Sequence, residues 1–216
     1  MGAITSGANS GIYLGNAGSV EATYLGIAAQ STGANSAIRI VNSGTVTSTG
    51  GPGSFSILVA PFDVYSIAIG AATTGPGSNI VVTSNGTARG VGPNGIGIGV
   101  NTGGAGSSNV IRNAGSVFGG FAGIGAISAT DTKIFNAGDV SAASDLAILA
   151  FGASIEIYNT GGITGFVRLT DEGDTFLNQK GGVFETKLVS EFGGGNDLFQ
   201  NQAGGTVQAA TNRNAA

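Results

Sequence analysis

The chain has 216 residues, a formal net charge of −4 and neither cysteine nor histidine. The acidic balance argues against a nucleic-acid ligand, which needs a basic footprint, and the lack of cysteine excludes disulfides and thiolate metal sites. No apolar run approaches the roughly 20 residues of a membrane-spanning helix, so we expect no membrane span. With 41 glycines, 4 prolines and 9% charged residues, the composition excludes collagen and favours many short strands joined by turns.

A short phrase recurs along the chain: an apolar residue, any residue, then Asn-x-Gly-x-Val. It covers residues 14–20 and 40–46, returns at 111–117, 134–140 and 157–163, and has looser copies at 82–86, 176–183 and 199–207. Its anchor is an asparagine in seven places: Asn16, Asn42, Asn113, Asn136, Asn159, Asn178 and Asn201. A phrase repeated at a fixed period is the signature of a repeat architecture.

The interval between Asn42 and Ser84 is too wide for one turn of this repeat. Two Gly-Pro-Gly-Ser phrases lie in or at the edge of it, one beginning at Gly51 and the other at Gly75. When the first phrase is aligned with the second, Ala60 falls on Ser84, which predicts a degenerate coil around residues 47–75. The anchors then number nine, and their mean spacing of about 23 residues lies in the range of solenoid repeats.

A repeat of about 23 residues has the length of one three-strand turn of a parallel β-helix. We therefore predict an all-β chain, a single right-handed parallel β-helix (solenoid) of about nine coils spanning residues 1–216, with three short strands in each coil. Aliphatic runs between the anchors supply a second strand, at residues 24–27, 67–69, 96–98, 124–127, 146–149 and 167–169. Hairpin turns at Asn-Gly pairs are an alternative, but they do not explain the fixed apolar positions on both sides of the anchor.

The anchor asparagines are predicted to point inward. Successive residues of a strand face opposite sides, and the residue two before the anchor is apolar in almost every coil. Asparagine tolerates left-handed backbone angles and the glycine that follows permits them, which suits a turn. Coils stack about 4.8 Å apart, so each carboxamide is expected to donate to one neighbour and accept from the other. The sequence therefore predicts a structural asparagine ladder.

Carboxylates gather in the C-terminal third. Asp174 and Asp197 both lie four residues before an anchor, so stacking is expected to bring their like charges to about 5 Å. A hard cation such as calcium would relieve the repulsion, with Asn196 and backbone carbonyls completing an oxygen shell. A polar turn that solvates both carboxylates, with no cofactor, is the alternative. Calcium is thus the one cofactor that the sequence suggests, with Asp174, Asp197 and Asn196 as its candidate ligands.

No catalytic constellation is evident, so the chain is predicted not to be an enzyme. It has no histidine, and its carboxylates outside the C-terminal third fall at different phases of the repeat. The tyrosines share no single register, which argues against a sugar-stacking stripe, and three arginines are expected on outward strand positions: Arg39, Arg112 and Arg168.

The Asn-x-Gly-x-Val phrase resembles the passenger repeats of bacterial autotransporter adhesins and related secreted haemagglutinin-type proteins. The resemblance runs over essentially the whole chain and is strongest at residues 172–178 and 193–201, which are similar to Gly-Asp-x-Phe-x-Asn repeats near the end of such passengers. It implies a fragment or mature secreted segment with a structural or adhesive role, located outside the cell or at the bacterial outer-membrane surface. The implied partner is the surface of a host or neighbouring cell, through a glycan or protein receptor.

Two alternatives to the stalk or adhesin remain. A β-helix has an unpaired strand edge at each end, so self-association through the ends into a filament or surface layer is the first. A polysaccharide-degrading β-helix enzyme is the second, because such enzymes share this fold class.

Overall fold

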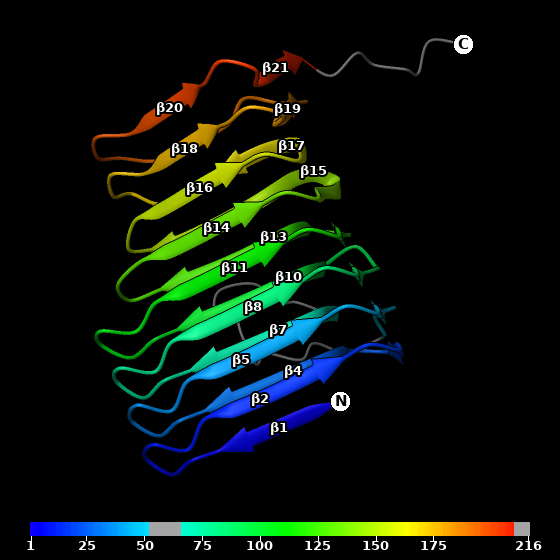
Figure 1. Cartoon of the computed structure of the whole chain (residues 1–216), viewed down its shortest axis with the longest axis vertical. Coiled ribbons are helices and arrows are strands. Elements are labelled where there is room, and N and C mark those ends of the chain that lie inside the picture. Colours follow the sequence, from blue (N-terminus) through cyan, green and yellow to red (C-terminus); the bar gives the residue numbers. More distant parts are fainter. Residues whose placement is uncertain (52–65, 210–216) are drawn as a thin grey trace.

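The computed structural model describes residues 1–51 and 66–209, and these residues form strands and turns without any helix. The described part therefore holds no helix of the length and apolarity needed to cross a membrane. The strands wind into a stack of coils with the N-terminus at one end and the last strands at the other (Figure 1). Every strand belongs to one of two sheets, and every strand pair is parallel.

One wall of the stack is an eight-stranded sheet that carries the anchor residues. Its strands, in stacking order, are β2 (Ile12–Asn16), β5 (Ile38–Asn42), β8 (Ile80–Ser84), β11 (Asn109–Asn113), β14 (Thr132–Asn136), β16 (Ile155–Asn159), β18 (Thr175–Asn178) and β20 (Leu198–Asn201). The anchor position of each strand pairs with the anchor position of the next. The recurring phrase therefore sets the register of this sheet.

A thirteen-stranded sheet forms the rest of the wall. Its strands are β1 (Gly2–Thr5), β3 (Ser19–Ala22), β4 (Leu25–Ser31), β6 (Thr45–Ser48), β7 (Ser66–Thr73), β9 (Thr87–Gly90), β10 (Gly95–Thr102), β12 (Ser116–Gly119), β13 (Ala122–Ser128), β15 (Asp139–Gly152), β17 (Gly162–Arg168), β19 (Val183–Thr186) and β21 (Thr206–Ala209). Two series of strands in this sheet join at the long strand β15, which pairs with both β12 and β13.

The parallel solenoid is as predicted, but the number of coils is not. Strand β5 pairs directly with β8, so that Asn42 lies beside Ser84, and β6 pairs directly with β9 in the same way. No rung separates them, and the stack has about seven turns instead of nine. The described residues between Asn42 and Ser84 belong to a single turn of the stack, and the predicted anchor Ala60 lies outside the described residues.

The predicted number of coils is wrong because the two Gly-Pro-Gly-Ser turns are not equivalent in the stack. Gly75 stacks on Gly33, not on Gly51: a Cβ added to Gly75 would lie 2.0 Å from the carbonyl oxygen of Gly33. The Gly33-Ala-Asn-Ser36 turn is therefore the true partner of the turn that begins at Gly75. These two turns differ in sequence, whereas the two Gly-Pro-Gly-Ser phrases are identical. The stacking of the backbones, and not the identity of the two sequences, shows which turns are equivalent.

Three strands per coil does not describe the whole stack either. Among the described residues, each coil from β2 to β13 shows three separate strands, in the order β2, β3, β4 and so on. From β14 onward the second and third strands merge, first into the 14-residue strand β15 and then into β17. The merged strands keep pairing across register shifts between Ser141 and Ile148.

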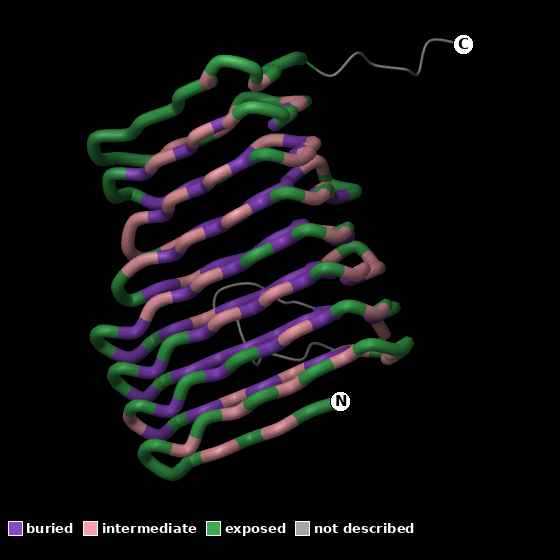
Figure 2. Tube along the Cα trace, in the orientation of Figure 1, coloured by how far each residue is buried: buried purple, intermediate pink, exposed green. Residues whose placement is uncertain are grey.

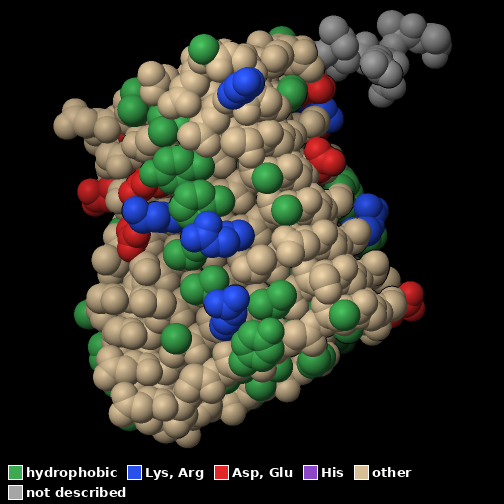
Figure 3. All heavy atoms as spheres, in the orientation of Figure 1, with side chains coloured by type: hydrophobic (Ala, Val, Ile, Leu, Met, Phe, Trp, Pro, Cys, Tyr) green, Lys and Arg blue, Asp and Glu red, His purple; other side chains and the backbone are tan. Residues whose placement is uncertain are grey.

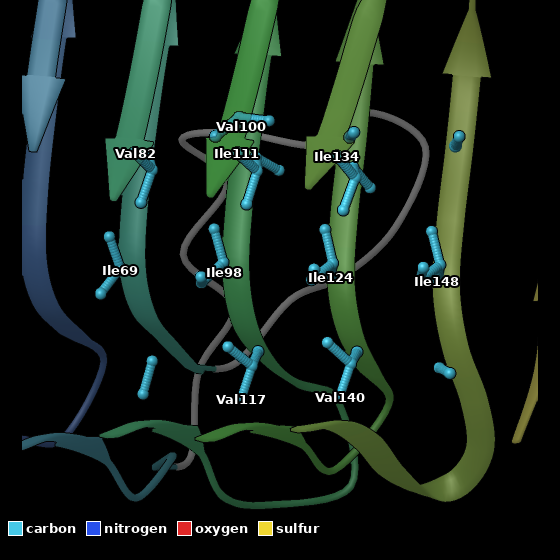
Figure 4. Packing of buried hydrophobic residues seen from close by; sticks show 14 of the residues in the cluster. Ile69, Val82, Ile98, Val100, Ile111, Val117, Ile124, Ile134, Val140 and Ile148 are labelled. Carbon is cyan, nitrogen blue, oxygen red and sulfur yellow. The ribbon is translucent and has the colours of Figure 1, made fainter. Parts of the chain in front are cut away.

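The core is a set of columns of small aliphatic side chains between the walls. Val82, Ile111 and Ile134 stack along the eight-stranded sheet and face the column of Ile98 and Ile124 from the other sheet (Figure 4). Burial follows the strands and gives way to exposed turns and an exposed last coil (Figure 2). Each buried isoleucine contributes about 1.5–3 kcal/mol, and no strand could bury its core face without a neighbouring coil.

Candidate functional site

The predicted asparagine ladder is present along the inner edge of the eight-stranded sheet. The side-chain Nδ2 atom of each anchor donates to the Oδ1 atom of the next: Asn16 to Asn42 over 2.9 Å, Asn113 to Asn136 over 2.9 Å, and Asn136 to Asn159, Asn159 to Asn178 and Asn178 to Asn201 over 2.8 Å each. In the one coil where serine replaces asparagine, Asn42 donates to the Ser84 hydroxyl over 3.3 Å. The ladder thus connects coils far apart in the sequence.

Most ladder amides also bond to their own turn. The Nδ2 atom of Asn136 donates to the carbonyl oxygens of Gly138 and Gly162, at 3.0 and 3.1 Å. The Oδ1 atom of Asn113 accepts from the backbone amide of Gly115 at 3.2 Å. The interior anchors are almost fully buried, and a buried amide left without partners would cost about 1–3 kcal/mol. The ladder satisfies these groups and also fixes the register of the coils.

The glycine two residues after the anchor, in the strict copies beyond the first coil, is needed for a reason that differs from the prediction. Neither the anchors nor these glycines have a positive φ among the described residues. Instead, a Cβ on Gly138 would lie 2.0 Å from the carbonyl oxygen of Gly115, and a Cβ on Gly115 would lie 1.9 Å from that of Gly86. The coils approach too closely at this corner for any side chain.

A second polar column, which the sequence reasoning missed, runs along the opposite end of these strands. Each serine hydroxyl in the column accepts a hydrogen bond from the backbone amide of the serine one coil earlier. The amide of Ser10 donates to Ser36, the amide of Ser36 donates to Ser78, and the amide of Ser78 donates to Ser107, over 2.8 to 3.0 Å. The residue before each serine is Asn9, Asn35, Gly77 or Gly106, and all four have a positive φ. The available signal was the recurring Gly-x-(Asn/Gly)-Ser turn.

Asp174, the first predicted calcium ligand, lies buried and holds three hydrogen bonds. Its Oδ1 atom accepts from the backbone amide of Ile155 and from the Thr170 hydroxyl, and its Oδ2 atom accepts from the Thr170 amide, all at 2.8 Å. Carboxylates accept strong hydrogen bonds from such donors. The side chain therefore ties strand β16 to the turn that precedes β18.

The structure brings Asp197 next to Asp174, as predicted, but through a backbone contact. The Oδ1 atom of Asp197 accepts from the Asp174 amide at 2.9 Å, and Asp197 and Asn196 are both exposed. Among the described residues, no group of three or more His, Cys, Asp or Glu side chains is arranged to hold a metal ion. These contacts describe the polar turn, and they do not test the predicted calcium site.

On the outer face of the eight-stranded sheet, three planar side chains of successive strands stack on one another. The Arg112 guanidinium carbon lies 4.3 Å from the ring centroid of Phe135, and the rings of Phe135 and Tyr158 stack with centroids 5.0 Å apart and planes 8° apart. We call Arg112, Phe135 and Tyr158 the outer stack. A shallow groove runs beside it, bordered by Asn85, Thr160 and Gln179.

A charged pair flanks the outer stack. The Lys133 Nζ atom lies 2.9 Å from Oε1 of Glu156, whose other oxygen accepts a short hydrogen bond from the Tyr158 hydroxyl. The hydrogen bond from Tyr158, and to a lesser degree the contact with Lys133, hold the pKa of Glu156 below its ordinary value of 4.5. The same contact with Glu156 raises the pKa of Tyr158 and of Lys133. The pair therefore stays ionised at neutral pH and keeps Tyr158 protonated.

The outer stack was visible in the sequence but was not recognised. Its members are the residues immediately before the anchors Asn113, Asn136 and Asn159. The prediction compared only the tyrosines with one another, and these do not share a register. Arginine, phenylalanine and tyrosine are chemically different residues, but at one register position they present similar flat surfaces.

Together the in-register sheets and the ladder define the class: a parallel β-solenoid repeat protein. No protein-family model, no curated protein and no solved structure matches the chain.

Proposed function

We propose that this β-solenoid is a segment of an exported bacterial surface protein and acts as a stalk or adhesive rod, as the resemblance to autotransporter-type passengers implies. The observation that supports the proposal most is the buried ladder, which links Asn42 to Ser84 and runs unbroken from Asn113 to Asn178. It locks the coils at one spacing, so seven turns at about 4.8 Å give a rod roughly 30 Å long that resists bending. A right-handed winding accords with the general handedness of connections between parallel strands.

The experiment is antibody labelling of producing cells before and after permeabilisation, paired with an adhesion assay. Antibody should label intact cells, and beads coated with the folded protein should adhere to cells above the level of beads coated with heat-unfolded protein. Labelling that occurs only after permeabilisation would overturn the surface location. Equal adhesion of folded and unfolded protein would overturn the adhesive role.

A second candidate function is assembly into a filament or layer through the ends of the solenoid. The side chains of Phe199 and Val207 in the last described coil are each 41% exposed. They occupy the columns that begin with Leu14 and Val20 in the first coil, so a second copy could continue both columns. Light scattering and negative-stain imaging across a concentration series separate the candidates. Filaments favour assembly, whereas monodisperse rods favour the stalk.

A further inference from the structure

We propose that the groove beside the outer stack binds a linear acidic polysaccharide, with Arg112 as the residue that recognises its carboxylate groups. The inference deepens the adhesive role proposed above, because it names the ligand class and the surface. It rests on the contacts of Arg112, on the direction of the groove and on the distribution of charge over the molecule.

Arg112 is held in place without being neutralised. Its guanidinium lies flat on Phe135, and none of the ion pairs among the described residues includes it. A guanidinium stacked on a ring keeps its in-plane N–H groups free to form two parallel hydrogen bonds to one carboxylate. Because the ring fixes the orientation in advance, little side-chain entropy is lost when a ligand binds.

The groove is long and runs across the strands. Asn85, Arg112, Phe135, Tyr158 and Gln179 lie on or just after five successive strands of the eight-stranded sheet. At about 4.8 Å per strand, the groove extends for roughly 20 Å along the solenoid axis. The spacing of the strands is close to the length of one pyranose unit. An extended polymer can therefore place successive units against successive coils.

The borders of the groove suit a polyhydroxylated ligand better than a peptide or a nucleic acid. Asn85, Thr160 and Gln179 offer amide and hydroxyl groups, which donate to and accept from sugar hydroxyls. Both faces of the Phe135 ring are covered, one by Arg112 and the other by Tyr158, so the stack acts as a wall and not as a platform for bases.

The charge balance of the eight-stranded sheet favours an anionic ligand. The eight strands of the sheet carry three basic residues, Arg39, Arg112 and Lys133, and one acidic residue, Glu156, a balance of +2 in a chain of net charge −4. Glu156 is itself bound to Lys133. Basic side chains lie beside hydrophobic ones in the middle of the face seen in Figure 3. An anionic polymer is therefore attracted to this sheet more than to the rest of the chain, whose net charge is negative.

The test is affinity electrophoresis of the full chain in gels that contain polygalacturonate or the same polymer with methyl-esterified carboxyls. Polygalacturonate should retard the protein and the ester should not. Arg112→Ala should weaken the retardation roughly tenfold, since hydrogen bonds between charged groups are lost. Arg112→Lys should restore little, because it keeps the charge but not the planar fork.

Arg89→Ala is the matched control. Arg89 also stacks on a ring, with its guanidinium carbon 4.7 Å from the centroid of Phe118, but it belongs to strand β9 of the other sheet. This change removes the same charge and the same kind of contact without touching the groove, so retardation should persist. Equal losses in both variants, or equal retardation by the esterified polymer, would overturn the proposal. So would the absence of retardation of the unmodified protein.

The bead assay separates this inference from the function on which it rests. If Arg112→Ala beads adhere to cells as well as beads carrying the unmodified protein, the groove is not the adhesive surface, although the protein is an adhesin. If the protein binds polygalacturonate but its beads adhere to no cell, the ligand class holds and the adhesive role fails.

Discussion

The Nδ2 atom of Asn136 lies 2.8 Å from the Oδ1 atom of Asn159, and both side chains are essentially fully buried. These two residues are 23 positions apart in the chain and occupy the same place in successive coils. Each amide is at once a donor to one neighbour and an acceptor from the other, so the column is satisfied only when all coils keep one register.

Removal of one interior amide should therefore destabilise the stack on both sides. We expect Asn136→Ala to lower the free energy of unfolding by about 2–4 kcal/mol, because partners in two coils lose their hydrogen bonds. Asn16→Ala is the control. Asn16 is half-buried at the first coil and has one ladder partner, so we expect a loss below about 1 kcal/mol. Urea unfolding followed by circular dichroism measures both, and similar losses would contradict the ladder's role.

The corner glycines should not tolerate a methyl group. We expect Gly138→Ala to destabilise the protein by about 1–3 kcal/mol, because its Cβ would lie 2.0 Å from the carbonyl oxygen of Gly115. Gly18 occupies the same register in the first coil, where no atom lies within 4 Å of an added Cβ. Gly18→Ala should leave the melting temperature unchanged or slightly raised. A loss of stability in Gly18→Ala would show that backbone flexibility, not contact, selects glycine here.

Asp174 should act as a hydrogen-bond acceptor within the fold. Asp174→Asn turns one acceptor oxygen into a donor that faces backbone N–H groups of Ile155 or Thr170, so we expect a loss of about 1–3 kcal/mol in urea unfolding. Asp171 is exposed, and Asp171→Asn should change stability by less than about 0.5 kcal/mol.

Calcium provides the complementary test at the same place. Because three donors already satisfy the Asp174 carboxylate, we expect millimolar calcium to leave the melting temperature unchanged. A calcium-dependent increase that disappears in Asp174→Asn would instead establish the ion site that the sequence suggests.

Stability should fall at acid pH in part through Glu156. Its pKa is lowered in the folded chain by the Tyr158 hydroxyl and by Lys133. The sign follows from linkage: the ionised carboxylate stabilises the fold above its ordinary value of 4.5, and this contribution is lost as pH falls through the lowered folded pKa. Melting temperatures measured from pH 7 to pH 3 should fall less steeply for Glu156→Gln. Glu172→Gln, at an exposed turn, should keep the steep dependence, and parallel curves for all three proteins would refute the assignment.

The fold class and the inner surface of one sheet could be predicted from the residues alone. Alternation along each strand decides which side chains face inward, and a phrase that returns at a regular interval places equal side chains at equal positions. The columns of Ile134 and Ile157, and of Asn136 and Asn159, follow from these two facts.

Where the spacing is irregular, the folded stack was needed to establish which coil lies on which. Asn42 pairs with Ser84 because their strands stack directly, although a literal repeat at Gly51 and Gly75 indicated an extra coil.

The same holds for two kinds of contact between coils: Gly138 is needed for close approach, and Asp174 binds N–H groups. Each of these contacts depends on the distance and direction at which one backbone passes another. That geometry exists only once the whole stack has formed.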